Sequence, residues 1–468
     1  YIASGAQAEA AGDLQVSYHA GLVSAREEKA LGVNVNFDPC VDILYNWRNT
    51  IVNTRAYGTD AETVIKYTNA YLDGLTAENG ENMEDGVIQC IKHFPGDGTE
   101  ERDQHLVLGV NELSPEEWRA SFGKVYQNHI DRGVEMIMAG HIAVPALQKE
   151  LNPALEDKDI MPATLAEELI QDELKTELGF NGLVITDATH MLGMTSAMRR
   201  EDYVPKSIAA GCDMFLFFNN IAEDFGFMLK GYQNGVITEE RLTDALRRIL
   251  GLKAKLHLPE KQANGTLLRT REDLNVIGCE EHLQWRAEAA DKGISLIKDT
   301  QNNLPINPVD HKRIRLYMLE GEKGGITDNG SKAQQLFVDE LTKRGYEVTV
   351  NERGSRVKGA TLKYRDEVDF ALEVADIAGY GAQNNYRIQW STAMANEVPW
   401  FVWEVPHAFV SLNFTTHLHD ATMVKTFVNA YHNNEETIKQ VIDKLEGKSE
   451  FKGGHNDLVW TDKWQAKL

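Results

Sequence analysis

One short stretch of this chain holds the residue types that acid–base chemistry requires. Lys92 and His93 follow an apolar run, and Asp103 and His105 come soon after them. An aspartate that bonds one imidazole nitrogen fixes the tautomer of the ring and stabilises its protonated form, so the histidine can act as an acid or base near neutral pH. Taken alone, however, Asp103 and His105 fit a solvated charged loop more simply than an active site.

A carboxylate at the end of another apolar run is the second candidate. Asp187 follows the segment 182–186 (GLVIT), which has the composition of a buried strand. A carboxylate at the mouth of a sheet can be a nucleophile, a base or a metal ligand. The alternative is a structural aspartate that bonds the backbone of the next loop.

Three further side chains could bind a substrate. Lys92 and His93 could donate hydrogen bonds to hydroxyl groups or bind an anion, and Arg55 could hold a substrate from one side. The alternatives are a salt-bridging lysine beside a core histidine, and an arginine that pairs with a carboxylate.

The elements that must position these residues form a repeating pattern in the first half of the chain. An amphipathic helix is followed each time by a short apolar strand, and Ser114 with Glu117 forms a capping box before one such helix. Thr164 with Glu167 repeats that box before the next helix. The expected strands are 33–37, 87–91, 134–139, 183–186 and 214–218. This alternation predicts a parallel sheet with helices outside it.

Polar residues at the strand ends favour a barrel over an open sheet. Asp38, Lys92, His93, His141, Asp187 and Asn219 all fall where an expected strand ends. In a TIM-type (β/α)8 barrel, the C-terminal ends of the strands meet at one face, where the active site lies. An open doubly wound sheet would gather such residues at a single switch point instead.

The second half predicts a smaller α/β sandwich. Its expected strands are 314–319, 346–350, 370–374, 400–403 and 409–412, with a helix at 332–344. We therefore expect a barrel domain over 1–258, whose last helix is capped by Thr238, a linker over 259–292 and a sandwich domain over 293–468.

The amino-acid composition indicates which kinds of partner this protein can bind. The 468 residues include 48 Lys and Arg against 71 Asp and Glu, a net charge of −23 that repels phosphate backbones and argues against nucleic acid. No apolar run reaches the roughly 18 residues that a membrane span needs. A neutral or cationic small substrate fits this charge better.

The cysteine and glycine patterns predict neither a metal nor a nucleotide cofactor. The four cysteines are widely spaced without a CxxC pair, which suits a reducing, cytoplasmic compartment. The histidines lack HExxH-type spacing, and no GxGxxG follows a strand.

Together these motifs resemble glycoside hydrolase family 3, in particular its β-N-acetylglucosaminidase branch. The residues that carry the resemblance are 35–43 (VNFDPCVDI, like NFAPVxDI), 53–58 (NTRAYG, like xTRSFG), 92–105 (like KHFPGHG…DSH), 162–165 with 179–188 (like PATL…GFxG…TDA) and, in the second half, 293–298 with Leu304 and Pro305.

The resemblance implies a retaining glycosidase that acts on a terminal β-linked sugar, a small carbohydrate substrate. Asp187 would be the nucleophile, and His105, oriented by Asp103, would be the acid/base. Lys92, His93 and Arg55 would hold sugar hydroxyls. Most retaining glycosidases use a second carboxylate where this branch uses a histidine.

The chain departs from the family pattern at three places. Asp97 stands where the family has the second histidine of KHFPGHG, and Gln104 stands where it has the serine of DSH. The first two barrel strands of the family would precede Tyr1, so we expect an incomplete barrel.

Four alternatives to a β-N-acetylglucosaminidase stay open. They are a family 3 β-glucosidase, a β-N-acetylglucosaminide phosphorylase, a degenerate homologue that binds sugar without cleaving it, and a metal-dependent barrel hydrolase. A neutral histidine base tolerates an anionic acceptor such as phosphate better than a carboxylate does.

Overall fold

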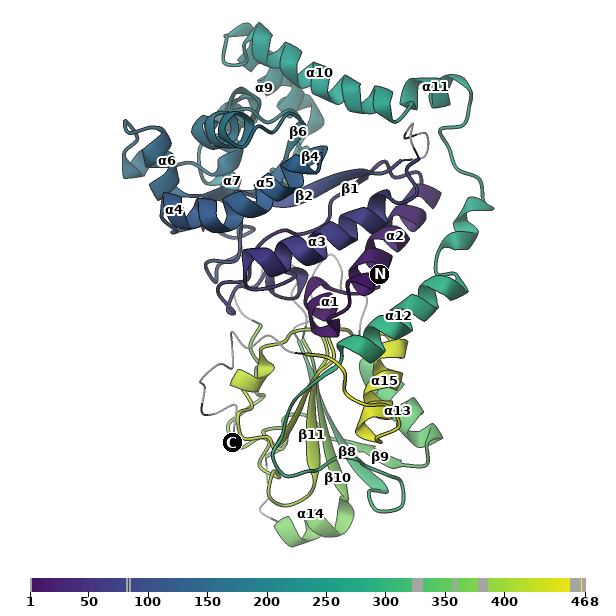
Figure 1. Cartoon of the computed structure of the whole chain (residues 1–468). Helices are drawn as coiled ribbons and strands as arrows, with labels where there is room; N and C mark the ends of the chain where they lie inside the picture. Colours follow the sequence, from purple (N-terminus) through teal and green to yellow (C-terminus); the bar gives the residue numbers. More distant parts are fainter. Residues whose placement is uncertain are drawn as a thin grey trace. The chain divides into compact units, whose positions relative to one another are not determined.

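The computed structural model describes residues 2–80, 83, 86–321, 331–356, 360–377, 386–454 and 464. The chain divides into two compact units. The first is Ser17–His282, and the second joins Ile2–Val16 to Leu283–Leu468. Figure 1 labels their helices and strands along the sequence.

The first unit is built on a parallel sheet. Its strands follow the order β1 (Val35–Asn36), β2 (Ile88–Phe94), β4 (Met136–Ala139) and β6 (Leu183–Thr186). Every residue of β4 and β6 is buried, as in sheets that are covered on both faces. The shorter strands β3 (Gly109–Val110) and β5 (Ile142–Ala143) pair beside this sheet.

Helices connect these strands and cover the sheet. A capping box of Ser114 and Glu117 starts α4, and Thr238 caps α10 through the backbone N–H of Arg241, as the sequence predicts. The helices of this part of the chain are α2 (Leu14–Ala30), α3 (Ala61–Thr76), α4 (Pro115–Trp118), α5 (Lys124–Asp131), α6 (Pro145–Leu151), α7 (Leu192–Thr195), α8 (Arg200–Ala209), α9 (Ile221–Gln233), α10 (Glu239–Lys255), α11 (Leu258–Ala263) and α12 (Glu280–Gly293), with π-helical segments at Arg119–Gly123 and Glu168–Glu177.

Two local predictions in this unit are wrong. The hydroxyl of Thr164 makes no helix cap, because it is bonded to Nδ1 of His141 at 2.9 Å. Segment 214–218 is no strand, since only Met214 forms a bridge to the sheet, opposite Ile185. The left-handed backbone of Phe217 (φ 63°) breaks the extended conformation there.

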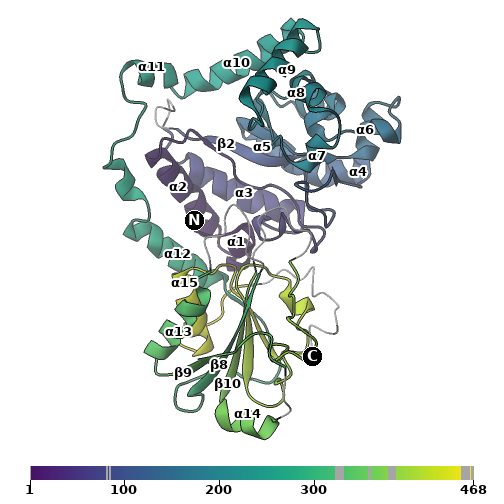
Figure 2. The ribbon, with the colours of Figure 1, turned by 180° about the vertical axis from the view of Figure 1, so that it is seen from behind.

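The second unit is a six-stranded sheet in the order β7-β12-β11-β10-β8-β9, parallel except for the antiparallel pair of β7 and β12. Helices α13 and α15 lie against one face in both views (Figures 1 and 2). The elements are α1 (Gly5–Ala11), β7 (Ser295–Asp299), β8 (Arg313–Glu320), α13 (Ala333–Lys343), β9 (Glu347–Val350), α14 (Thr361–Glu367), β10 (Phe370–Asp376), β11 (His407–Ser411), β12 (Thr426–Asn429) and α15 (Glu435–Leu445).

These observations confirm the predicted α/β class, a barrel-type parallel sheet with a smaller α/β sandwich. The strand predicted at 400–403 is wrong, because that segment is a turn. Phe401 from this turn instead stacks on Tyr317 of β8, with ring centroids 4.9 Å apart. Within the described residues, no helix is long and apolar enough to cross a membrane.

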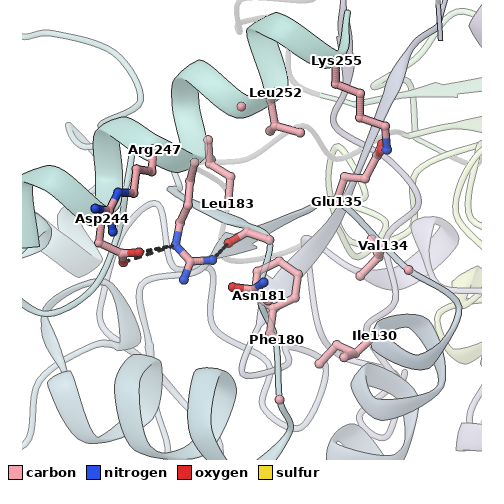
Figure 3. A pocket seen from close by; sticks show the side chains of 15 residues that line it. Ile130, Val134, Glu135, Phe180, Asn181, Leu183, Asp244, Arg247, Leu252 and Lys255 are labelled. Carbon is pink, nitrogen blue, oxygen red and sulfur yellow. Dashed lines mark hydrogen bonds and ion pairs between the residues drawn. The ribbon is translucent and has the colours of Figure 1, made fainter. Parts of the chain in front are cut away.

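An open groove lies between α10 and the amino ends of β4 and β6 (Figure 3). Several of its polar groups are bound to one another. Arg248 donates to the carbonyl of Gly182 at 2.6 Å and to Asp244 at 3.2 Å, while Lys255 pairs with Glu135. In barrel enzymes the active site lies at the opposite, carboxyl ends of the strands.

Candidate active site

The carboxyl ends of β2 and β6 hold the central residues of the candidate site. Asp187 directly follows β6, and its backbone N–H donates to the carbonyl of Ala139 on β4 at 2.8 Å. Lys92 and His93 lie within β2 and not on the loop after it, which corrects the sequence prediction. The strand itself therefore fixes these two side chains more firmly than a loop would.

Asp187 is an almost buried carboxylate among imidazoles. Its Oδ2 lies 4.0 Å from Nε2 of His93, and its Oδ1 accepts a hydrogen bond from the backbone N–H of Ala188 at 2.7 Å. Burial alone would raise the pKa of Asp187. The electrostatic influence of the His93 and His141 imidazoles together with the Ala188 bond outweighs burial and lowers that pKa below its usual value. The side chain is therefore ionised at neutral pH.

Asp103 and His105 form the pair that the sequence suggested. Nδ1 of His105 lies 2.7 Å from Oδ1 of Asp103, which also accepts the backbone N–H of His105 at 2.9 Å. Asp103 is fully buried, whereas the side chain of His105 is 39% exposed and so accessible to a substrate. Burial lowers the pKa of His105, but the hydrogen bond and charge of Asp103 more than offset this and raise it. The Asp187 charge acts on His105 in the same direction.

Lys92 and Arg55 surround the same strand ends. The ammonium of Lys92 donates to the carbonyl of Phe37 and lies 3.4 Å from Oδ1 of Asp38. One guanidinium nitrogen of Arg55 donates to the carbonyl of Ile51 at 3.2 Å. A second lies 3.5 Å from Nε2 of His93, which brings Arg55 next to the histidine that faces Asp187.

His141 holds the loop that follows Asp187. Its Nδ1 is bonded to the hydroxyl of Thr164, and its Nε2 lies 2.9 Å from the carbonyl of Ala188. His141 is fully buried. Its position at a strand end marked it in the sequence, but its two bonds make it a support for the loop.

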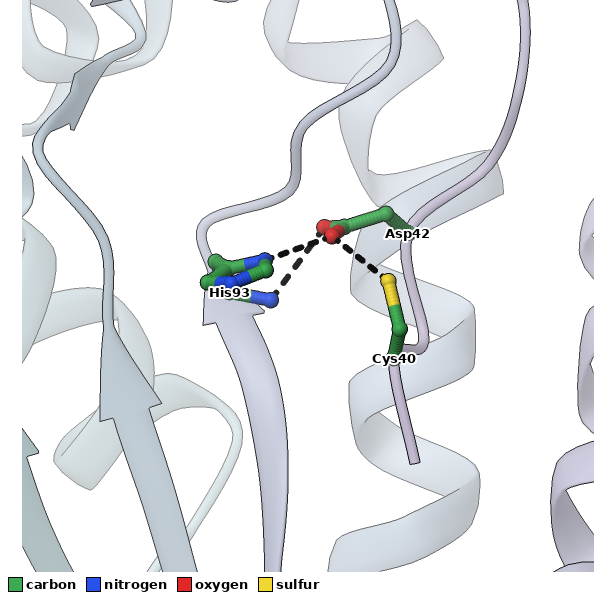
Figure 4. Close-up of side chains that lie close together, drawn as sticks. All are labelled: Cys40, Asp42 and His93. Atoms are coloured by element: carbon green, nitrogen blue, oxygen red, sulfur yellow. Dashed lines mark hydrogen bonds and ion pairs between the residues drawn. The ribbon is translucent and has the colours of Figure 1, made fainter. Parts of the chain in front are cut away.

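Asp42, which the sequence pattern did not single out as a site residue, is fully buried beside His93 (Figure 4). Oδ2 of Asp42 lies 2.7 Å from Nδ1 of His93 and 3.0 Å from Sγ of Cys40. The segment 35–43 contains both Cys40 and Asp42. The second aspartate of this segment, Asp42, was the signal in the sequence that could have identified the residue.

Cys40, Asp42 and His93 lie close enough to be considered as a metal site, with one ligand atom of each within 4.8 Å of the others. The donor set does not fit a metal. The oxygens of Asp42 already accept four hydrogen bonds, and burial raises the pKa of the Cys40 thiol well above its usual value. A thiol that keeps its proton is a poor metal ligand.

Residues 3–252 match the family described as Glycosyl hydrolase family 3 N terminal domain, which is more than half of the chain. The chain belongs to glycoside hydrolase family 3. It is a glycoside hydrolase enzyme that acts on β-linked sugars, and the predicted family is thereby confirmed.

Relatives within family 3 carry more than one activity in their names. The chain is 39% identical over 473 residues to a Beta-N-acetylglucosaminidase/beta-glucosidase of Cellulomonas fimi, a match that covers 100% of this chain and 82% of that protein. It is 28% identical over 300 residues to Beta-hexosaminidase A of Pseudoalteromonas piscicida, a match that covers 62% of this chain and 48% of that protein.

The solved structures that resemble this chain also differ in the activity that their titles give. The structure titled Beta-glucoside phosphorylase BglX has a TM-score of 0.92 and 38% identity, and the match covers 100% of this chain and 82% of that one. A family 3 β-N-acetylglucosaminidase from Paenibacillus has a TM-score of 0.77 at 22% identity over 96% of this chain and 81% of its own, which supports the fold alone.

Proposed function

We propose that this family 3 enzyme removes terminal β-linked N-acetylglucosamine with retention of configuration, through a glycosyl-enzyme intermediate on Asp187. The observation that carries the proposal is the combination of an ionised, largely buried Asp187 with the His105–Asp103 pair at one end of the sheet. A nucleophile must be ionised, whereas a general acid must hold a proton, and the two environments favour these opposite states.

The first chemical step forms the intermediate. A carboxylate oxygen of Asp187 attacks the anomeric carbon as the bond to the leaving oxygen breaks. His105 gives its Nε2 proton to that oxygen, while Nδ1 stays bonded to Asp103. The leaving alcohol departs neutral, and the sugar remains joined to Asp187 as an ester.

The second step releases the sugar. The neutral Nε2 of His105 takes a proton from water, whose oxygen attacks the anomeric carbon from the face that the leaving group vacated. The ester bond to Asp187 breaks and the carboxylate is restored. Each step inverts the configuration at the anomeric carbon, so the two steps together retain it.

Lys92, His93 and Arg55 would hold the hydroxyl groups of the sugar in this mechanism. Their polar atoms gather around the ends of β1 and β2, next to Asp187. All six proposed residues belong to the Ser17–His282 unit, so we assign catalysis to this unit. The free cysteines, of which Cys40, Cys90 and Cys212 are buried, suit a cytoplasmic location.

Phosphorolysis is the second candidate, and a specific observation favours it. The proposed base is an imidazole, which is neutral when it accepts a proton, and the guanidinium of Arg55, whose pKa is raised, acts on it as a nearby cation. An anionic acceptor meets no repulsion from such a base, whereas a carboxylate base would repel it. The solved relative at 38% identity is titled a phosphorylase.

Hydrolysis of p-nitrophenyl β-N-acetylglucosaminide by wild type, Asp187→Ala and His105→Ala tests the proposal. Both variants should lose activity, and azide should rescue Asp187→Ala with formation of a glycosyl azide. Parallel assays with p-nitrophenyl β-glucoside, each with and without phosphate, separate the candidates. A preference for the glucoside would change the proposed sugar from N-acetylglucosamine to glucose. A sugar 1-phosphate product would mean that phosphate, and not water, is the acceptor. No turnover in any assay would overturn the proposal in favour of sugar binding alone.

A further inference from the structure

We propose that Asp42 is a positioning residue that fixes the tautomer and the direction of His93, so that Nε2 of His93 points to the substrate as a hydrogen-bond acceptor. The inference rests on the proposed function, because it concerns how His93 meets a sugar hydroxyl beside Asp187.

Asp42 holds both the backbone and the ring of His93. Its Oδ1 accepts the backbone N–H of His93 at 3.2 Å and that of Asp97 at 2.8 Å. Its Oδ2 lies 2.7 Å from Nδ1 of His93 and accepts from the thiol of Cys40 at 3.0 Å (Figure 4). Asp42 is therefore the common anchor of β2 and of the turn that follows it.

An ionised Asp42 accepts hydrogen bonds and cannot donate one. Burial raises the pKa of Asp42, but the electrostatic attraction and hydrogen bond of the His93 imidazole, together with the bonds from the Asp97 N–H and the Cys40 thiol, outweigh it and bring that pKa down to about 2. Nδ1 of His93 must then carry a proton, which leaves Nε2 without one in the neutral ring.

The surroundings of Nε2 agree with this tautomer. A guanidinium nitrogen of Arg55, which can only donate, lies 3.5 Å from Nε2 of His93. A proton on Nε2 of the neutral ring would set two donors against each other. With Nε2 as acceptor, the ring can receive a hydrogen bond from Arg55 or from a sugar hydroxyl, 4.0 Å from the carboxylate of Asp187.

The substitution Asp42→Asn separates the two functions of the carboxylate, which are to hold the backbone of His93 and Asp97 and to set the tautomer of the His93 ring. The remaining amide oxygen can replace Oδ1 and still accept from the backbone of His93 and Asp97. The amide nitrogen takes the place of Oδ2 and donates to Nδ1 of His93. This transfers the ring proton to Nε2 and turns the acceptor that faces the substrate into a donor.

We would measure steady-state kinetics, thermal unfolding and the ¹⁵N NMR signals of ¹⁵N-histidine-labelled protein for wild type and Asp42→Asn. The signals of His93 would be assigned with His93→Gln. Wild type should show the Nδ1–H tautomer and Asp42→Asn the Nε2–H tautomer. We expect KM to rise more than kcat falls, with kcat/KM lower by on the order of 10- to 100-fold.

Asp213→Asn is the matched control. Asp213 is also buried, accepts the backbone N–H of Val184 at 2.8 Å and pairs with Arg241, and within the part of the chain that the structure describes it forms no hydrogen bond or ion pair with His93. This variant should lower the Tm while the tautomer of His93 and KM stay as in wild type.

A wild-type Nε2–H signal for His93, or an unchanged tautomer and KM in Asp42→Asn, would overturn the inference. Failure of the proposed function looks different. In that case wild type cleaves no aryl glycoside, yet the NMR signals still report whether Asp42 sets the tautomer.

Discussion

Gln104 is hydrogen-bonded to Asp97, so the two residues at which this chain departs from the loop pattern of its family meet each other. Nε2 of Gln104 lies 3.4 Å from Oδ2 of Asp97, while Oε1 of Gln104 accepts the backbone N–H of His141 at 2.8 Å. Asp97 also accepts from the side chain of Asn49 at 2.9 Å. Both residues are buried, so the paired departures form one network beneath the loop that carries His105.

A double-mutant cycle can measure how strongly Gln104 and Asp97 depend on each other, because their side chains are in contact. Gln104→Ser removes the bonds to Asp97 and His141, so the loop loses support, and we expect kcat/KM to fall about tenfold. Because the two side chains touch, Gln104→Ser and Asp97→His should be non-additive by about 0.5–3 kcal/mol in kcat/KM. The measurement is kcat/KM for wild type, both single variants and the double variant.

The variant Gln127→Ser on α5 serves as the control for this cycle, since the Gln127 side chain bonds Asp131 and the carbonyl of Leu178 and none of the site residues. Effects that add within about 0.3 kcal/mol would mean that Gln104 and Asp97 act independently.

The pH dependence of kcat/KM should report the two proposed catalytic groups. The pKa of Asp187 is lowered and that of His105 is raised, so activity needs Asp187 deprotonated and His105 protonated. The acid limb should therefore lie below 3.8 and the alkaline limb above 6.5, the usual values of the two groups. Asp103→Asn removes the charge that raises the His105 pKa, so it should move the alkaline limb to lower pH.

Asp97 is one group that could imitate this alkaline limb. Burial and the neighbouring charge of Asp42 raise the pKa of Asp97 to about 7. In Asp97→Asn the limb should remain where it is in wild type. A limb that disappears in Asp97→Asn and stays in Asp103→Asn would assign it to Asp97.

The parts of the site that follow from strand patterns could be predicted from the sequence. The buried run Leu183–Thr186 is β6 with the predicted bounds, and Asp187 comes at its end because a parallel strand delivers its last residue to the carboxyl edge. Asp103 and His105 are two residues apart, so their bond is local and visible in the sequence.

Contacts between distant residues could not be predicted in this way. Asp42 lies 51 residues from His93, and the parallel pairing of β1 with β2, continued by the bridge between Cys40 and Lys92, brings the two together. Thr164 has the sequence of a helix cap, yet its hydroxyl is bonded to His141, a partner from another strand end. In both cases tertiary contacts override the local pattern.

Arg55 provides a test of substrate binding. Burial lowers its pKa, but Cys40 and the carboxylates Asp38, Asp42 and Asp187 raise it on balance, so the guanidinium stays charged. Arg55→Lys keeps the charge and loses the fork of donors that reaches Ile51 and His93 at once. We expect KM to rise about tenfold with a smaller change in kcat.

Arg48→Lys is the matched control for this test, because Arg48 is exposed and lies over the ring of Trp47. Its KM should equal that of wild type. An Arg55→Lys enzyme with a wild-type KM would remove Arg55 from the proposed binding site.

In the second unit, Glu373 is a buried carboxyl group without a hydrogen-bond partner among the described residues. It lies on the central strand β10, next to Tyr317 of β8 and Phe409 of β11, and is 1% exposed. Burial, with a smaller contribution from Glu397, raises its pKa well above 4.5. The folded protein therefore keeps this carboxyl neutral, and a buried polar group without a partner costs about 1–3 kcal/mol.

The raised pKa of Glu373 fixes the sign of its effect on stability. Between the unfolded and the folded pKa, the folded state holds one more proton at Glu373 than the unfolded state. The stability that the protonated Glu373 contributes is therefore fully present below pH 4.5 and is lost as pH rises toward the folded pKa. Relative to Glu373→Leu, wild type should lose unfolding free energy as pH rises above 4.5, by at most about 1.4 kcal/mol per pH unit. Urea unfolding of both proteins at three pH values measures this difference, with the exposed Glu367→Gln as control. A difference that does not change with pH would mean that Glu373 is ionised in the folded protein.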